Sequence, residues 1–190
     1  MTEPEPPPSI AVPELRDYHQ INAEIVRRLN RGETHVRLEG VERQRLLVAG
    51  LSGPWEATVE LIGDAGPELA AGMDAPGIVV VCRGSSADGA GSGLKAGSLF
   101  LHGPTGTAVG YAQAGGLIVA LGSVGPRAGL RMSGGELVLS TSAGPLAGEG
   151  QTGGRLYLPT TDVGPHAGWN ARGGVRSTVD AALRARLRFS

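Results

Sequence analysis

The side chains that could do chemistry are few, and they are not spaced as a catalytic or metal-binding set. The four histidines stand apart from one another and from any cysteine or carboxylate at metal-ligand spacing; they are His19, His35, His102 and His166. Serines lie beside glycines without the Gly-x-Ser-x-Gly elbow that exposes a nucleophile; they are Ser85, Ser86, Ser133 and Ser142. The acidic residues of the repeated region do not pair on one face by spacing. The sequence therefore predicts a scaffold rather than a catalyst.

Composition narrows the class of protein further. A chain of 190 residues with 41% hydrophobic residues and a formal net charge of -1 is typical of one soluble domain. There is no basic stripe of the kind that binds nucleic acid. The single cysteine, Cys82, excludes an internal disulfide. With neither a signal peptide nor an apolar run long enough for a bilayer, a cytoplasmic protein without membrane contact is expected.

Glycines recur between Gly103 and Gly154 with a period of 19 residues. Each copy has two separated glycines, then a glycine pair, then a short aliphatic run. The copies are Gly106, Gly110 and Gly115-Gly116; Gly125, Gly129 and Gly134-Gly135; and Gly144, Gly148 and Gly153-Gly154. Looser copies extend from near Val36 to Gly174. A fixed period of about 20 residues with short strands and glycine corners predicts an all-β parallel β-helix, or solenoid, of about six to seven coils.

The corner glycines are expected to be structural, because a corner with positive φ or with close coil-to-coil contact accepts only a residue without Cβ. They are Gly106, Gly110, Gly116, Gly125, Gly129, Gly135, Gly144, Gly148 and Gly154. If φ is positive at Gly125, Gly125→Val should cost about 1–3 kcal/mol in strain, whereas Arg127→Ala should cost little. A disordered linker or a phosphate-cradling loop fits less well, because the turns alternate with aliphatic runs and no helix pattern follows them.

Four segments are predicted along the chain. Residues 1–13, with five prolines, have the composition of a disordered tail. Residues 14–31 carry apolar positions at spacings of three and four and predict an amphipathic helix that covers the first coil. Residues 34–174 hold the β-helix. Residues 175–190 predict a short basic helix that covers the last coil, with Ser177 and Asp180 as its capping pair.

Within the repeat, the second and fourth strand positions after each corner are apolar and are expected to face inward. They are Val79 and Val81, Leu99 and Leu101, Ile118 and Ala120, Leu137 and Leu139, and Leu156 and Leu158. The position between them then faces outward, yet it is also apolar: Val80, Phe100, Val119, Val138 and Tyr157. Such a stripe is either a row of tolerated β-formers or a partner interface, and we favour the interface.

The corners Gly125-x-x-x-Gly129-x-x-Met132-Ser133-Gly134-Gly135, with their copies, resemble the GXGXG domain that closes the large subunit of glutamate synthase. The same repeat occurs in one of the subunits of formylmethanofuran dehydrogenase and in one of those of methylamine-glutamate N-methyltransferase (N-methylglutamate synthase). The resemblance runs from Tyr18 to Gly174 and includes Ile21-Asn22 in the leading helix. The repeat is specific for the domain and discriminates poorly among the enzymes that contain it.

The resemblance implies a right-handed parallel β-helix with no catalytic residue, metal or cofactor of its own. Its partners would be a class II glutamine amidotransferase-like subunit and an FMN-binding glutamate synthase-like subunit, which carry FMN and, as an option, an iron-sulfur cluster. The expected role is that of a scaffold in such a complex, with the N-methylglutamate synthase type as one candidate. Two alternatives stay open: the scaffold of a formylmethanofuran dehydrogenase or formyltransferase-hydrolase-like complex, and an independent ligand-binding or hydrolase solenoid with a deep polar pocket.

Overall fold

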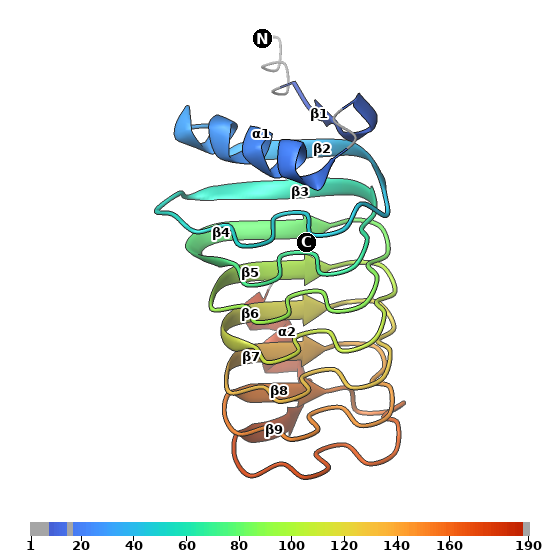
Figure 1. Cartoon of the computed structure of the whole chain (residues 1–190). Helices are drawn as coiled ribbons and strands as arrows, with labels where there is room; N and C mark the ends of the chain where they lie inside the picture. Colours follow the sequence, from blue (N-terminus) through green and yellow to red (C-terminus); the bar gives the residue numbers. More distant parts are fainter. Residues whose placement is uncertain (1–7, 15–16, 188–190) are drawn as a thin grey trace.

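The chain winds into a β-solenoid of about seven turns with one short helix near each end (Figure 1), as a computed structural model of residues 8–14 and 17–187 describes it. Each turn adds one strand to a single parallel sheet, whose nine strands stand in sequence order. The strands are β1 (Ile10–Ala11), β2 (His35–Glu42), β3 (Ala57–Asp64), β4 (Asp74–Cys82), β5 (Ala96–Leu101), β6 (Ala114–Ala120), β7 (Gly134–Leu139), β8 (Arg155–Leu158) and β9 (Val175–Thr178). The predicted parallel solenoid is confirmed.

Each coil also contains a turn segment in which three residues of positive φ alternate with residues of ordinary φ. In one coil they are Ala108, Gly110 and Ala112, with φ of 59°, 66° and 51°. The middle N–H, of Gly110, donates to Ala90 O of the preceding coil at 2.8 Å. The outer two N–H groups donate to the following coil, at Pro126 and Leu130. The turn segments therefore form a second main-chain ladder that joins the coils, in addition to the sheet.

The corner glycines are explained by two different constraints. Six of the nine have positive φ, Gly129 among them at +69°. At Gly125 φ is not positive; instead, a Cβ there would lie 2.7 Å from Gly106 O of the preceding coil. The predicted cost of Gly125→Val therefore has another cause than backbone strain: the added side chain would meet main-chain atoms one coil away.

The N-terminal end of the solenoid begins earlier than predicted. Ile10 and Ala11 form β1, which pairs in parallel with Leu38 and Glu39 of β2, and Val12–Glu14 forms one turn of 3-10 helix. Ile10 and Val12 are buried. The prediction of a disordered tail through residue 13 is therefore wrong for its last residues, because two aliphatic side chains among the prolines reach the core. Residues 1–7 lie outside the described part of the chain.

Helix α1 (Tyr18–Asn30) lies over the first coil, as predicted. It starts after Asp17, whose side chain accepts from His19 N, and not at residue 14; Leu15 lies outside the described residues. Asn22 acts as a substitute for a missing coil: its Nδ2 donates to Leu46 O and its Oδ1 accepts from Val48 N, both at 2.8 Å. Val48 N thus finds in the Asn22 side chain the acceptor that its equivalent, Gly110 N, finds in the preceding coil.

The inward positions follow the predicted alternation in four coils and depart from it in β4. Leu99, Ile118, Leu137 and Leu156 are fully buried, as predicted. In β4 the buried residues are Ala75, Ile78, Val80 and Cys82, so the predictions that Val79 and Val81 face inward and Val80 outward are wrong.

An irregularity at the start of β4 causes this error. Five residue steps separate Asp74 from Val79, but only two separate their partners Ala96 and Ser98 in β5. Gly77 therefore does not correspond to Gly97, and counting from it shifts the whole strand by one position.

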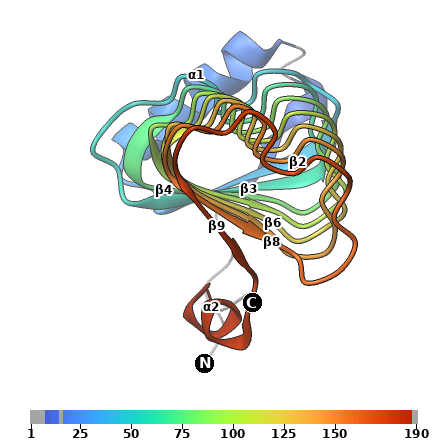
Figure 2. The same cartoon turned by 90° about the horizontal axis from the view of Figure 1, so that it is seen from below.

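Helix α2 (Ala181–Leu187) does not cover the last coil. The chain continues past Gly174 as β9 and then turns back, so that α2 lies against the outer face of the sheet, outside the ring of coils (Figure 2). Asp180 caps the helix, with Leu183 N donating to its Oδ1 at 2.7 Å, but Ser177 belongs to β9 and is no part of the cap. The predicted covering of the final coil by this helix is wrong, and within residues 8–14 and 17–187 that end of the solenoid stays open.

Candidate functional site

The outward side chains of the central strands form a continuous apolar row, which we call the outer ladder. Its members lie directly opposite one another across β4 to β8 and are Val81, Phe100, Val119, Val138 and Tyr157. Val119 and Val138 are nevertheless fully buried, because Val179 and Leu183 pack over them. Two arginines of α2 also make polar contacts with residues of the coils: Arg184 Nη2 donates to Ser140 O at 3.4 Å, and Arg186 pairs with the Glu136 carboxylate.

The five residues predicted as a partner interface therefore separate into two groups. Val80 belongs to the interior. Phe100, Val119, Val138 and Tyr157 face outward as predicted, but α2 covers this surface. The stripe is thus apolar in part because a helix of the same chain packs against it. Contact with a partner at the outer ladder stays a prediction.

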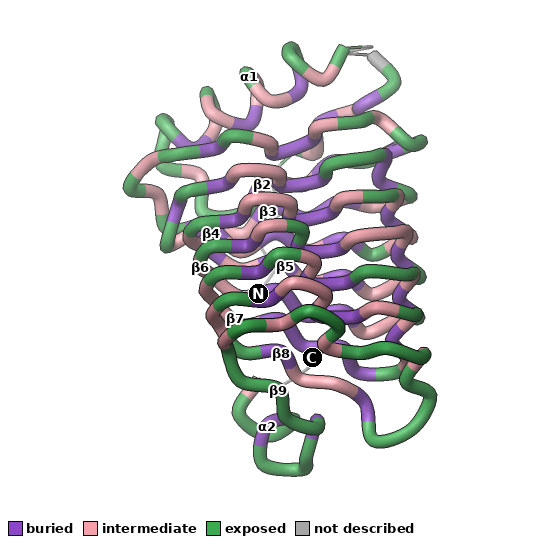
Figure 3. Tube along the Cα trace, turned by 60° about the horizontal axis from the view of Figure 1, so that its bottom comes forward, coloured by how far each residue is buried: buried purple, intermediate pink, exposed green. Residues whose placement is uncertain are grey.

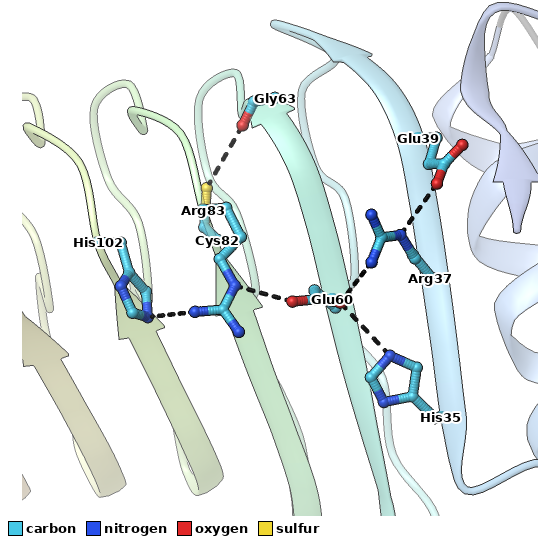
Figure 4. Close-up of polar contacts among 8 residues, drawn as sticks. All are labelled: His35, Arg37, Glu39, Glu60, Gly63, Cys82, Arg83 and His102. Atoms are coloured by element: carbon cyan, nitrogen blue, oxygen red, sulfur yellow. Dashed lines mark hydrogen bonds and ion pairs between the residues drawn. The ribbon is translucent and has the colours of Figure 1, made fainter. Parts of the chain in front are cut away.

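A polar cluster occupies the other half of the outer face, next to the N-terminal end (Figure 4). Its centre is Glu60 of β3, which is 8% exposed. Arg83 Nε donates to Glu60 Oε1 at 2.8 Å. Oε2 of the same carboxylate lies 3.5 Å from Arg37 Nη1 and 3.4 Å from His35 Nε2. Arg83 Nη1 also lies 3.3 Å from His102 Nε2, so the cluster joins residues of four successive coils.

The cations around Glu60 control its charge. Partial burial raises the pKa of this carboxyl, but the hydrogen bond and charge of Arg83, together with the charges of Arg37 and His35, outweigh burial and lower the pKa below 4.5. At His102, partial burial and the positive charge of Arg83 lower the pKa below 6.5. At neutral pH the cluster thus holds an ionised carboxylate between two guanidinium groups, with a neutral imidazole beside them.

This arrangement is suited to joining strands rather than to moving protons. A carboxylate with a lowered pKa is a weak base, and its oxygens already accept from cations. Sequence reasoning missed the cluster, although a signal existed: Arg37 and Glu60 each stand between two inward aliphatic residues, Val36-Arg37-Leu38 and Val59-Glu60-Leu61. Aligning these two strands by their aliphatic pairs places Arg37 directly opposite Glu60.

Replacing Glu60 by Gln is expected to destabilise the solenoid by about 1.5–3 kcal/mol at neutral pH, because it removes a charged hydrogen-bond acceptor and leaves Arg83 without its carboxylate partner. Since the pKa of Glu60 is lower in the folded state, the stabilisation is complete above pH 4.5 and is lost as pH falls through the folded-state pKa. Chemical denaturation at several pH values should show a gap between wild type and variant that closes in acid. Glu39→Gln, which also removes a partner of Arg37 but at an exposed position, should have little effect. A gap independent of pH would contradict this account.

Other chemical features of the described residues are structural in character. Burial raises the pKa of the Cys82 thiol to about 11, so it is not a nucleophile at neutral pH. Within residues 8–14 and 17–187, no three His, Cys, Asp or Glu side chains converge on a point where a metal ion could bind. An apolar pocket of about 210 Å³ lies between α1 and the first coil, beside Ile25, Val48 and Trp55. Neither described helix has the length and apolar character needed to cross a membrane.

Comparisons with protein-family models, with curated proteins and with solved structures found no match to this chain.

Proposed function

We propose that this chain is a non-catalytic solenoid scaffold subunit of a glutamate synthase-like complex. A class II glutamine amidotransferase-like subunit and an FMN-binding subunit would supply the chemistry, together with FMN and an optional iron-sulfur cluster. The N-methylglutamate synthase type is the member of this class to test first. We place the protein in the cytoplasm, where such partners would meet it.

One observation supports this proposal most directly: the corner glycines that carry the resemblance occupy equivalent places in successive coils. Gly115, Gly134, Gly153 and Gly173 each face a carbonyl oxygen of the preceding coil, which an added Cβ would approach to 2.0–2.3 Å. The glycine repeat is thus a geometric requirement of this solenoid, as expected for a domain of the GXGXG type. Fold alone does not determine function, so the identity of the partners must be measured.

The full chain, carrying an affinity tag and expressed in its native host, is expected to co-purify with an amidotransferase-like chain and an FMN-binding chain. Mass spectrometry identifies the captured chains, and the flavin spectrum of the eluate reports FMN. Formyl-transfer proteins in the eluate would favour the alternative complex instead. Recovery of the chain alone, at native expression level, would reject both.

A second arm of this experiment asks which face the partners use. Phe100→Asp changes the outer ladder at a partly buried position next to α2, and it is expected to abolish capture if the partners contact the ladder. Val79→Asp, which faces outward on the neighbouring strand, provides the matched control. If both variants capture the partner chains as well as wild type does, the ladder is rejected as the interface but the complex is not.

A further inference from the structure

The two ends of the solenoid are finished differently. At the N-terminal end, β1 pairs with β2, and the Asn22 side chain of α1 forms hydrogen bonds with main-chain groups of the first turn segment. At the C-terminal end, α2 lies on the outer face instead, and residues 161–178 are exposed or partly exposed throughout (Figure 3). We call residues 161–178 the open coil.

The open coil has a set of main-chain groups that lack the partners their equivalents have one coil earlier. N–H groups of Ala143, Leu146 and Gly150 donate to the open coil at 3.0, 3.0 and 2.8 Å. The carbonyls of Ala143, Ala147 and Gln151 accept from it at 2.7, 2.7 and 2.8 Å. The corresponding groups of the open coil make no hydrogen bond within residues 8–14 and 17–187; they are the N–H groups of Val163, His166 and Asn170 and the carbonyls of Val163, Ala167 and Ala171.

Large apolar side chains are concentrated at the same end. Val163, Trp169 and Val175 are 40%, 56% and 53% exposed. Among the described residues, the one other large hydrophobic side chain with comparable exposure is Tyr111, at 38%. An unpaired strand edge bordered by exposed apolar side chains is a template for pairing with another chain.

We propose that the open coil binds the open coil of a second copy of this chain across a two-fold axis. The order of the free groups favours this occupant: N–H of 163, C=O of 163, N–H of 166, C=O of 167, N–H of 170, C=O of 171. In the reverse direction, this series has an acceptor wherever the forward series has a donor. Two antiparallel copies therefore satisfy each other, with the axis between His166 and Ala167, which is the self-complementarity that a two-fold interface requires.

Head-to-tail stacking is disfavoured, because α1 and β1 already occupy the opposite end. The interior of the open coil is also partly covered: Arg176 takes the inward position after Leu156, and its Nη1 donates to Gln151 Oε1 at 2.9 Å. This charged side chain limits the apolar area available for contact, so the dimer relies on main-chain pairing and on the apolar rim. It is a closed, reversible dimer that does not extend into a fibre.

Analytical ultracentrifugation of the full chain tests this proposal. A monomer–dimer equilibrium is expected, and Val163→Asp with Trp169→Asp should weaken it at least about tenfold, since the pair removes the apolar rim and an aromatic contact. Both positions are exposed, so circular dichroism should stay unchanged, as should melting at protein concentrations where wild type and variant are both monomeric. Tyr111→Asp is the matched control and should dimerise normally. A chain that is monomeric at all concentrations, oligomers that keep growing, or a dimer insensitive to the double substitution would overturn the proposal.

Cysteine cross-linking tests the axis directly. His166→Cys should form a disulfide-linked dimer under mild oxidation, because residue 166 lies beside its own symmetry mate. Glu68→Cys is a matched control, since Glu68 is exposed, has the same φ of 62° and sits at the equivalent place of an early coil. The native Cys82 is buried and should not react. Cross-linking of both variants alike would reject the axis. The result does not depend on the proposed function, which concerns other chains.

Discussion

Replacing Val138 by Asp is expected to release α2 from the sheet while the solenoid stays folded. Val138 is fully buried under Val179 and Leu183, so a carboxylate there would be desolvated without a partner. The helix has only seven residues and is too short to be stable by itself in water. Detachment is therefore the easier response, at a cost of about 1–3 kcal/mol for the lost packing.

Hydrogen exchange of the α2 amides measures this release, and trypsin cleavage at Arg184 and Arg186 reports it independently. Val79→Asp faces outward on the same sheet away from the α2 cluster and should leave α2 protected. Protection of α2 in Val138→Asp equal to wild type would mean that the helix is held elsewhere. Because Val119 and Val138 are fully buried, a charged substitution at either position changes the chain's own structure and not only a contact with a partner.

The solenoid was predictable because its corners accept only glycine at certain positions, and this steric requirement repeats in the sequence. Stacked coils bring main chains so close that glycine must recur, and the period of 19 residues follows from coil length. Alternation then gives the correct inward side chains from Leu99 to Leu156. Where a strand contains an irregularity, as between Asp74 and Val79, no residue type marks it, and a one-residue slip exchanges the two faces of β4.

Surface features were predicted less well, since their partners are distant in sequence. The apolar outer ladder was visible as a pattern, but its covering by α2 was not, because an amphipathic helix fits an open coil or a sheet face equally well. Glu60 escaped notice because its cations, Arg37 and Arg83, come from two other coils 23 residues away on either side. Only a register for β2 to β4 joins these three residues into one site.

Gly134→Ala is expected to destabilise the solenoid by about 3 kcal/mol in the free energy of unfolding, at the upper end of the range for overpacking. A Cβ at this position would lie 2.1 Å from Ala114 O and 2.8 Å from Ala114 C, which are main-chain atoms of the preceding coil. Relief requires the two coils to separate locally, which disturbs the pairing around Gly134 and Ala114. Because the obstacle is main chain, it cannot move aside as a flexible side chain would.

Two further substitutions separate this steric effect from backbone strain. Gly150 has φ of +64°, but a Cβ there meets its nearest atom at 3.6 Å, so Gly150→Ala should cost only about 1–2 kcal/mol of left-handed strain. The equivalent places in neighbouring coils hold Ala112, Arg131 and Asn170, all with positive φ, which shows that side chains fit there. Arg127→Ala keeps one L-residue in place of another at φ of +61° and should change stability least. Denaturant titration should therefore show the largest loss in the free energy of unfolding for Gly134→Ala, a smaller one for Gly150→Ala and the smallest for Arg127→Ala. Equal losses for Gly134→Ala and Gly150→Ala would mean that φ alone sets the glycine pattern and that the close approach of successive coils is not its cause.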